Sequence, residues 1–198
     1  MLDANATIAD FTAAAAAKQP TPGGGAVTAL AGALAATMGE MVLQYSVNKK
    51  DLVTHAAFNA EVLAEFTRAR HALLELMAED QAVFAALTAA KKAGGETQSF
   101  VEACIAVPQA MGAMALAILD LARRVAPTSN RYLASDLAVC GELATAAVRA
   151  ASHNVRANLG DVSAERRAEL EADCERSVNL AVDHVRKLTD GISRAAAS

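Results

Sequence analysis

"PTPGGGAVTALAGALAATMGEMVLQYSVNKK", residues Pro20 to Lys50, joins three consecutive glycines to a long run of small and apolar residues that ends at two lysines. The bulky residues of this run follow a helical period, and on one side they alternate with small residues spaced three or four apart: Gly25, Ala29, Gly32, Ala36 and Gly39. A helix side made of small residues lets another backbone approach closely. The stretch therefore predicts a helix over about Gly25 to Val47 that packs tightly in a core or a subunit interface.

The rest of the chain also follows a helical period, and no stretch shows sustained alternation of apolar and polar residues. The apolar fraction is 54%, with no Trp and only five Phe and two Tyr, which favours packed helices over a sheet-based core. We expect an all-α fold, a single domain over residues 1–198 built as a bundle of about six long helices. The expected helices cover about 7–18, 25–47, 52–92 (as one helix or two), 97–124, 131–159, and a last one that Ser163 caps.

A carboxylate interrupts an apolar ladder in the segment from Leu52 to Lys92. The ladder repeats every seven residues as Phe66, Leu73, Asp80 and Leu87. A carboxylate on an apolar helix face needs a cation, a hydrogen-bond donor or a cleft, because burial disfavours its charge. Asp80 is thus either part of a structural ion pair or a functional group, and the sequence leaves both open. Lys49 or Lys50 is the partner to propose, although antiparallel packing of the two helices would require a third element or a second subunit for that contact.

Polar residues also interrupt the predicted helix over 131–159. Asp136 and Asn154 are eighteen residues apart, which places them on one helix face about 27 Å apart, and Asn158 lies one turn beyond. Asparagine amides carry donors and acceptors together and suit the edge of a heterocycle. The alternatives are a helix cap for Asn130 and solvent exposure for some of the others.

The three glycines Gly23, Gly24 and Gly25 do not indicate a nucleotide site. Neither GxxxxGK[ST] nor GxGxxG is present, and no strand precedes them. Helix capping or close approach of the backbone to another group explains them equally well.

Bulk properties exclude several classes of protein. A net charge of −4 argues against a nucleic-acid binder. Three well-separated cysteines indicate reduced core thiols, and four histidines show no spacing for a metal or a catalytic triad, so we expect no metal and no covalent catalysis. No signal peptide is evident, and the apolar stretch from Ala103 to Leu119 is broken by Pro108, Gln109 and Gly112, so no membrane span is expected. These features predict a cytoplasmic protein.

Four segments together resemble the cyclodeaminase/cyclohydrolase family. They are PTPGGGAVTALAGALAATMGEMV with the lysine pair after it, EDQAVF at 79–84, SNRYLASDLAV at 129–139 and NVRANL at 154–159. The family includes the cyclodeaminase part of formiminotransferase-cyclodeaminase and the free-standing methenyltetrahydrofolate cyclohydrolases. The segments occur in order along nearly the whole chain, with Asn48 and Gln81 standing where the family often has glycine and alanine.

The resemblance implies a helical homodimer with a folate site in a groove shared between subunits. A cyclohydrolase adds water to the methenyl carbon of 5,10-methenyltetrahydrofolate and gives 10-formyltetrahydrofolate; a cyclodeaminase closes the ring of 5-formimino-tetrahydrofolate and releases ammonia. No cofactor beyond the tetrahydrofolate substrate is implied. Since no formiminotransferase domain is fused to the chain, the cyclohydrolase is the first expectation. The cyclodeaminase, or a non-catalytic helical dimer that binds folate or a protein, is the alternative.

The resemblance also suggests roles for individual residues. Asp80 and Lys49 would manage protons and charge at the one-carbon unit. The polar residues Asn130, Asp136, Asn154 and Asn158 would hold the pterin or order the water, and Lys50 or Arg131 would meet the glutamate tail. Gly23, Gly24 and Gly25 would let the backbone approach the ligand or the partner. Carboxylates and asparagines at positions that suit leucine or alanine favour an enzyme over a structural protein.

Overall fold

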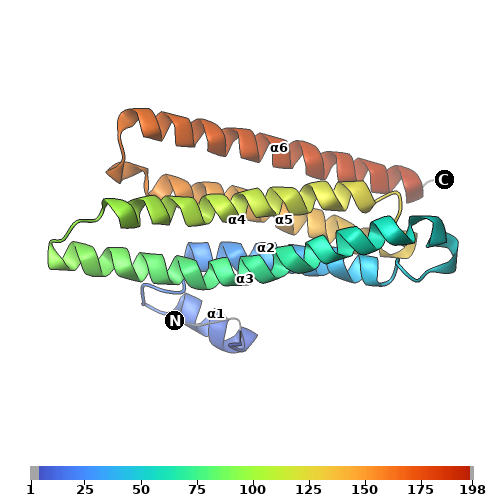
Figure 1. The fold of residues 1–198 in the computed structure, drawn as a ribbon, viewed down its shortest axis with the longest axis horizontal. Coiled ribbons are helices and arrows are strands. Elements are labelled where there is room, and N and C mark those ends of the chain that lie inside the picture. The colour runs from blue at the N-terminus through green and yellow to red at the C-terminus, as the bar shows by residue number, and fades with distance from the viewer. Residues whose placement is uncertain (1–4, 197–198) are drawn as a thin grey trace.

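The computed structural model describes residues 5–196 and confirms the all-α class (Figure 1). Its α-helices are α1 (Ile8–Ala16), α2 (Gly24–Gln44), α3 (Ala56–Ala93), α4 (Gln98–Val125), α5 (Ala134–Ala157) and α6 (Ala164–Ala196). Three short 3₁₀ helices connect them: η1 (Lys50–His55), η2 (Arg131–Leu133) and η3 (Leu159–Asp161). Helices α2 to α6 run alongside one another, and α1 lies outside the bundle near the start of α2 (Figure 1).

The predicted helix boundaries needed small corrections. Residues 50–55 form η1, so α3 begins at Ala56 instead of Leu52, and residues 131–133 form η2 before α5 begins. Asn130 begins η2, because its side-chain oxygen accepts a hydrogen bond from the N–H of Tyr132 at 3.2 Å. The predicted cap of the last helix is confirmed: the N–H of Arg166 donates to the Ser163 hydroxyl at 3.2 Å.

Helix α2 lies at the centre of the bundle, in contact with α3, α4 and α5. Its glycines Gly32 and Gly39 face Leu73 and Phe66 of α3, both fully buried. A Cβ added to Gly32 would meet Leu73 at 3.1 Å, and one added to Gly39 would meet the Phe66 ring at 2.5 Å. Each glycine is therefore a hole that a side chain of α3 fills, and the seven-residue spacing is the same on both helices. The small side of α2 and the ladder of α3 interlock, in antiparallel order.

A second side of α2 carries apolar residues that are partly open to solvent. Val27, Leu34 and Tyr45 are 47%, 48% and 64% exposed. Ala31, Met38 and Met41 fill the positions between them and are partly buried. The spacing of these six residues alternates between four and three, which is the pattern of a helix-pairing seam. We call these six residues the α2 seam.

Helices α2 and α4 are long and apolar enough to cross a membrane by length and composition alone. In the bundle, 56% and 50% of their most apolar windows are buried. Core helices have the same composition, so this property is weak evidence for a membrane span. Helix α6 is an outer helix with ion pairs along it, such as Arg166–Glu169 at 3.2 Å and Lys187–Asp183 at 2.5 Å.

Candidate active site

Three of the four sequence segments that carry the resemblance meet at one cavity of about 340 Å³. The cavity lies where the loop before α2, the first turn of α2, and parts of α3, α4 and the end of α5 come together. Its lining residues are Pro20, Thr21, Gly23, Gly24, Gly25, Asp80, Val83, Phe84, Cys104, Pro108, Asn154, Ala157 and Asn158. Of the predicted site residues, the structure thus brings together the three glycines, Asp80, Asn154 and Asn158.

Asp80 takes the third place in the interlocked series of α2 and α3. A Cβ added to Gly25 would lie 1.9 Å from Oδ1 of Asp80, 2.3 Å from its Cγ and 2.5 Å from its Oδ2. The carboxylate therefore occupies the hole at Gly25 as Leu73 and Phe66 occupy theirs. Burial raises the pKa of Asp80, and a hydrogen bond from the backbone N–H of Ala26 opposes that rise. The start of α2 thus supplies a donor to a carboxylate that the core has partly removed from water.

The two asparagines of α5 are held by named partners. Nδ2 of Asn154 donates to Oγ1 of Thr28 at 3.0 Å, and that hydroxyl donates to the carbonyl of Gly24 at 2.7 Å. Nδ2 of Asn158 donates to two carbonyls, that of Asn154 at 3.0 Å and that of Cys104 at 3.3 Å. The carbonyl of Cys104 is available because Pro108, four residues later, has no N–H to donate to it.

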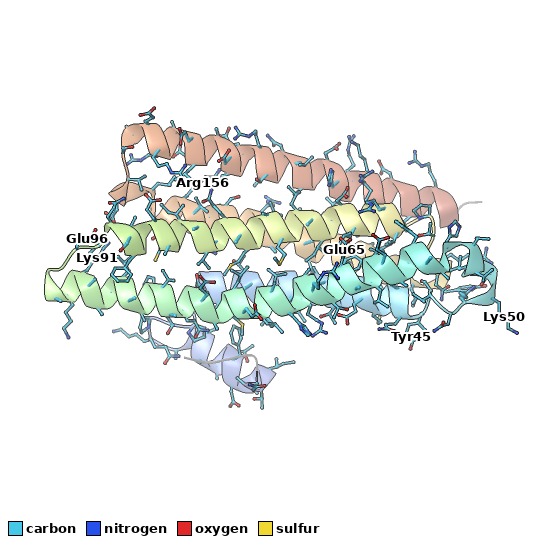
Figure 2. All side chains as sticks on the ribbon, viewed as in Figure 1. Tyr45, Lys50, Glu65, Lys91, Glu96 and Arg156 are labelled. Carbon is cyan, nitrogen blue, oxygen red and sulfur yellow. The ribbon has the colours of Figure 1, made fainter. Side chains whose placement is uncertain are left out.

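The other predicted site residues lie at the opposite end of α2. The 21 residues of this helix span about 30 Å. Tyr45 and Lys50 lie at one end of the bundle and Lys91 lies toward the other (Figure 2). Lys49 forms an ion pair with Asp51, and its Nζ lies 5.9 Å from the centre of the Tyr132 ring. Lys49 and Asp80 therefore form no pair within this subunit, as antiparallel packing of α2 and α3 requires.

Asn130, Arg131 and Asp136 lie with the lysines at this second end, which we call the lysine end. Asp136 is in the first turn of α5, whereas Asn154 is near its last turn. The guanidinium of Arg131 lies 5.2 Å from the centre of the Tyr132 ring. The backbone N–H of Asn130 donates to the buried Ser46 hydroxyl at 2.9 Å, which ties η2 to the end of α2. The predicted residues thus form two groups, one at each end of α2 and α5.

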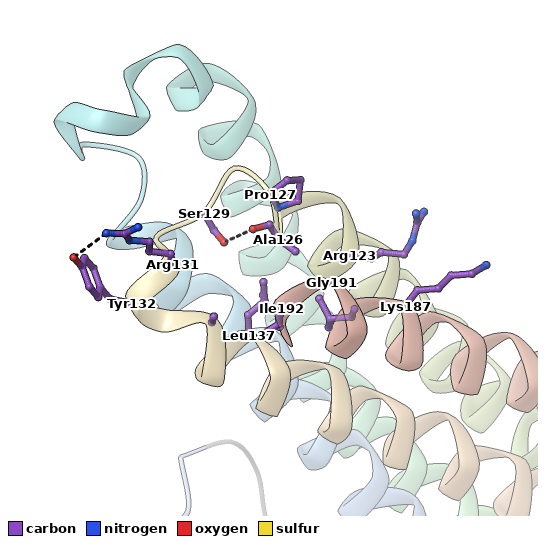
Figure 3. A pocket seen from close by; sticks show the side chains of 12 residues that line it. Arg123, Ala126, Pro127, Ser129, Arg131, Tyr132, Leu137, Lys187, Gly191 and Ile192 are labelled. Carbon is purple, nitrogen blue, oxygen red and sulfur yellow. Dashed lines mark hydrogen bonds between the residues drawn. The ribbon is translucent and has the colours of Figure 1, made fainter. Parts of the chain in front are cut away.

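A larger hollow of about 480 Å³ lies beside the lysine end, between the end of α4, η2, the start of α5 and the last turns of α6 (Figure 3). Leu137, Ile192 and Pro127 give it an apolar wall, while Arg123 and Lys187 extend side by side at its edge (Figure 3). Both of these cations already have acidic neighbours, since Arg123 pairs with Asp120 at 2.6 Å and Lys187 pairs with Asp183. The hollow thus has no unpaired charge at this edge.

Sequence reasoning missed Thr28 and Cys104. Thr28 looks like a small core residue in an apolar helix, and only the approach of Asn154 shows its second contact. Burial raises the pKa of the Cys104 thiol, and the nearby Asp80 charge adds to the effect, so the thiol stays protonated. Within residues 5–196, no group of three or more His, Cys, Asp or Glu side chains is placed to hold a metal ion.

The fold and the cavity agree with comparisons to known proteins. The family model described as formiminotransferase-cyclodeaminase matches residues 7–176, a range that includes both groups of predicted site residues. The chain belongs to this family. It is 32% identical over 165 residues to a methenyltetrahydrofolate cyclohydrolase of Methylorubrum extorquens, covering 78% of this chain and 79% of the relative.

A solved structure gives the same result. The crystal structure of formiminotetrahydrofolate cyclodeaminase from Thermotoga maritima matches with a TM-score of 0.86 and 26% sequence identity. The match covers 96% of this chain and 98% of that one. The resemblance inferred from four sequence segments is therefore confirmed at the level of the family and of the fold.

Proposed function

We propose that this protein hydrolyses 5,10-methenyltetrahydrofolate to 10-formyltetrahydrofolate. The observation that carries the proposal is the partly buried Asp80 carboxylate, held in the hole at Gly25 and facing a cavity lined by two asparagines. The relative named as a cyclohydrolase is 32% identical, whereas the solved cyclodeaminase is 26% identical, which favours hydrolysis as the first candidate.

The proposed reaction needs a general base beside the positively charged amidinium of the substrate. Water attacks the amidinium carbon between N5 and N10 while the Asp80 carboxylate takes one of its protons. The resulting hydroxyl adduct then loses its remaining O–H proton as the carbonyl forms, the C–N5 bond breaks, and its electron pair goes to N5, which takes up a proton. One proton is released in total. A positioned acid or base of this kind contributes about 10²–10⁴-fold to the rate, and the carboxylate also stabilises the positive charge of the substrate.

We further propose that two subunits complete each site. The exposed apolar residues of the α2 seam favour pairing with a second copy of the chain, because an isologous contact buries the same face on both subunits. We place the two-fold axis at the middle of the α2 seam, near Ala36, so that the two copies of α2 pair in antiparallel order. The partner's Lys49 then lies close to Gly23, and the partner's Arg131 lies in the same region. The two groups of predicted site residues then meet across the interface, with Asp80 from one subunit and Lys49 from the other.

Hybrid dimers test the shared site. Asp80→Asn and Lys49→Ala each inactivate both sites of a homodimer, so each variant alone should show little turnover. A mixture that is unfolded and refolded together in equal amounts forms half hybrid dimers, and each hybrid has one site with both residues intact. The mixture should regain about a quarter of wild-type activity, a result that follows from random pairing. If mixing restores nothing although each variant is folded and dimeric, the sharing of the site between subunits is wrong.

The activity itself is tested with two substrates in parallel. Loss of methenyltetrahydrofolate absorbance above the spontaneous rate identifies the cyclohydrolase. The cyclodeaminase is the second candidate, favoured by the TM-score of 0.86, and it would instead generate that absorbance from 5-formimino-tetrahydrofolate with release of ammonia. Folded protein that turns over neither substrate would leave a non-catalytic helical dimer that binds folate or a protein. We propose no cofactor beyond the substrate, no binding of nucleic acid or membrane, and a cytoplasmic location.

A further inference from the structure

We propose that the cavity beside α2 is a hydrogen-bond acceptor site that binds the donor edge of the pterin ring, its 2-amino and ring N–H groups, and that Thr28 positions Asn154 for this task. This inference rests on the proposed folate substrate and says which half of that substrate each group of site residues takes. The glutamate tail, which is anionic, then lies toward the lysine end of the partner subunit.

The hydroxyl of Thr28 decides which way the Asn154 amide faces. Its single proton goes to the Gly24 carbonyl at 2.7 Å, a bond from residue i to i−4 of the same helix. The hydroxyl can then only accept, and only the NH₂ end of an amide can donate to it. The amide group of Asn154 is therefore fixed with Nδ2 on Thr28, and Oδ1 lies 3.0 Å from where a Cβ of Gly24, a residue of the cavity lining, would be.

The side-chain amide of Asn158 is held in a fixed orientation too, but by two backbone carbonyls instead of a hydroxyl. An amide nitrogen has two protons, and those of Asn158 go to the carbonyls of Asn154 and Cys104. The second carbonyl is open to this bond because Pro108 cannot donate to it. Oδ1 of Asn158 is left for a ligand, and it accepts no hydrogen bond from any residue in the described part of the chain.

The cavity wall thus offers two amide oxygens to the donor edge, Oδ1 of Asn154 and of Asn158, while the Asp80 carboxylate in the same lining is left for the one-carbon unit. The two asparagines are one helical turn apart, about 6 Å along α5. The cavity lining, which lies wholly within residues 5–196, contains no Lys, Arg or His. Such a surface favours N–H donors and positive charge and disfavours a carboxylate, because an anion would find several oxygen atoms and no cation from the same subunit.

Equilibrium binding of two stable folates tests the inference independently of turnover. The probes are 5-formyltetrahydrofolate and its 2-deamino analogue, which lacks the amino donor. The wild-type protein should bind the amino compound about 10-fold more tightly, the discrimination expected when a buried acceptor loses its donor. In Thr28→Val the Asn154 amide is free to turn its NH₂ toward the cavity, so the ratio should fall to about 2-fold. Thr28→Ser keeps the hydroxyl and should restore the wild-type ratio.

Thr145→Val is a matched control. Thr145 is also buried in a helix and its hydroxyl donates to the carbonyl four residues earlier, that of Gly141, at 2.8 Å. This substitution removes the same kind of hydroxyl without touching an asparagine, so it should leave the binding ratio unchanged. Thermal unfolding shows whether each variant is folded. A purely structural effect would weaken the binding of both compounds equally and leave their ratio unchanged.

Several outcomes would overturn the inference. It is wrong if the wild-type protein binds both compounds equally, prefers the 2-deamino analogue, or binds neither at millimolar concentration. It is also wrong if Thr28→Ser behaves like Thr28→Val, since the hydroxyl would then not be the orienting group. A wild-type protein that shows the expected ratio but turns over neither folate substrate would instead contradict the proposed catalytic function and leave this inference standing.

Discussion

Replacement of Gly25 by alanine tests directly whether the fold positions Asp80 for function. The added Cβ would lie 1.9 Å from Oδ1 of Asp80, whereas ordinary contacts begin at 3.4 Å, so the carboxylate must retreat by about 1.5 Å. A displacement of about 1 Å in a reacting group costs on the order of 10²-fold in rate. We therefore expect Gly25→Ala to lower kcat/KM for methenyltetrahydrofolate by at least about 100-fold, or about 2.7 kcal/mol.

The effect on stability should be smaller than the effect on rate. Overpacking costs about 1–3 kcal/mol, and alanine recovers up to about 1 kcal/mol through its higher helix propensity. Gly191→Ala in α6 is the control, because a Cβ there meets nothing within 4 Å and Gly191 does not line the cavity that holds Asp80. Absorbance assays of turnover, together with urea unfolding of both variants, separate the effect on rate from the effect on stability. Wild-type kcat/KM in a folded Gly25→Ala protein would refute the claim that this hole places the reactive carboxylate.

Three further predictions concern stability. Gly39→Ala places a Cβ 2.5 Å from the buried Phe66 ring, so its free energy of unfolding in urea should fall by about 1–3 kcal/mol, and an unchanged midpoint would contradict the interlocked packing. Asp80→Asn should raise the melting temperature at pH 8 while removing activity. Burial raises the pKa of Asp80, so the protonated side chain stabilises the fold below the pKa it has in the unfolded chain, and this stability is lost as pH rises through its pKa in the folded protein. The increase in melting temperature of Asp80→Asn over the wild type should therefore vanish near pH 3. Arg70→Met removes the partner of Glu40, whose pKa Arg70 lowers chiefly through a hydrogen bond, with Nε 2.7 Å from Oε2. That variant should lose about 1 kcal/mol at pH 7, and the loss should shrink as pH falls through the lowered pKa of Glu40, as unfolding at pH 7 and pH 3 would measure.

The helical part of the structure was predictable because its signals are local. The small residues of α2 and the ladder of α3 repeat every seven residues, and both periods are visible in the sequence without knowledge of the partner helix. The cap at Ser163 depends on a few neighbouring residues. Asp80 stood out for the same reason, since one carboxylate broke an otherwise apolar series.

The arrangement of the site was less predictable because it depends on which elements meet. The sequence placed Asp136 and Asn154 about 27 Å apart on one face of a helix, and the structure assigns these two ends of α5 to different groups of site residues. Pro108 frees the carbonyl of Cys104 by a local rule, whereas the donor to that carbonyl, Asn158, comes from 54 residues away. Thr28 gave no signal at all, since a threonine bonded within its own helix has the same sequence pattern with or without Asn154 beside it.

The interlocked helices also bear on how such a protein can change over generations. Phe66, Leu73 and Asp80 fill three equivalent holes in α2, so selection for a stable fold and selection for a reactive carboxylate act on one repeated contact. An exchange of Asp80 for leucine would complete the apolar series and remove a partly buried acid. Relaxed selection for the reaction should therefore favour that exchange. A descendant with leucine at this position would have a more stable fold and no catalytic activity.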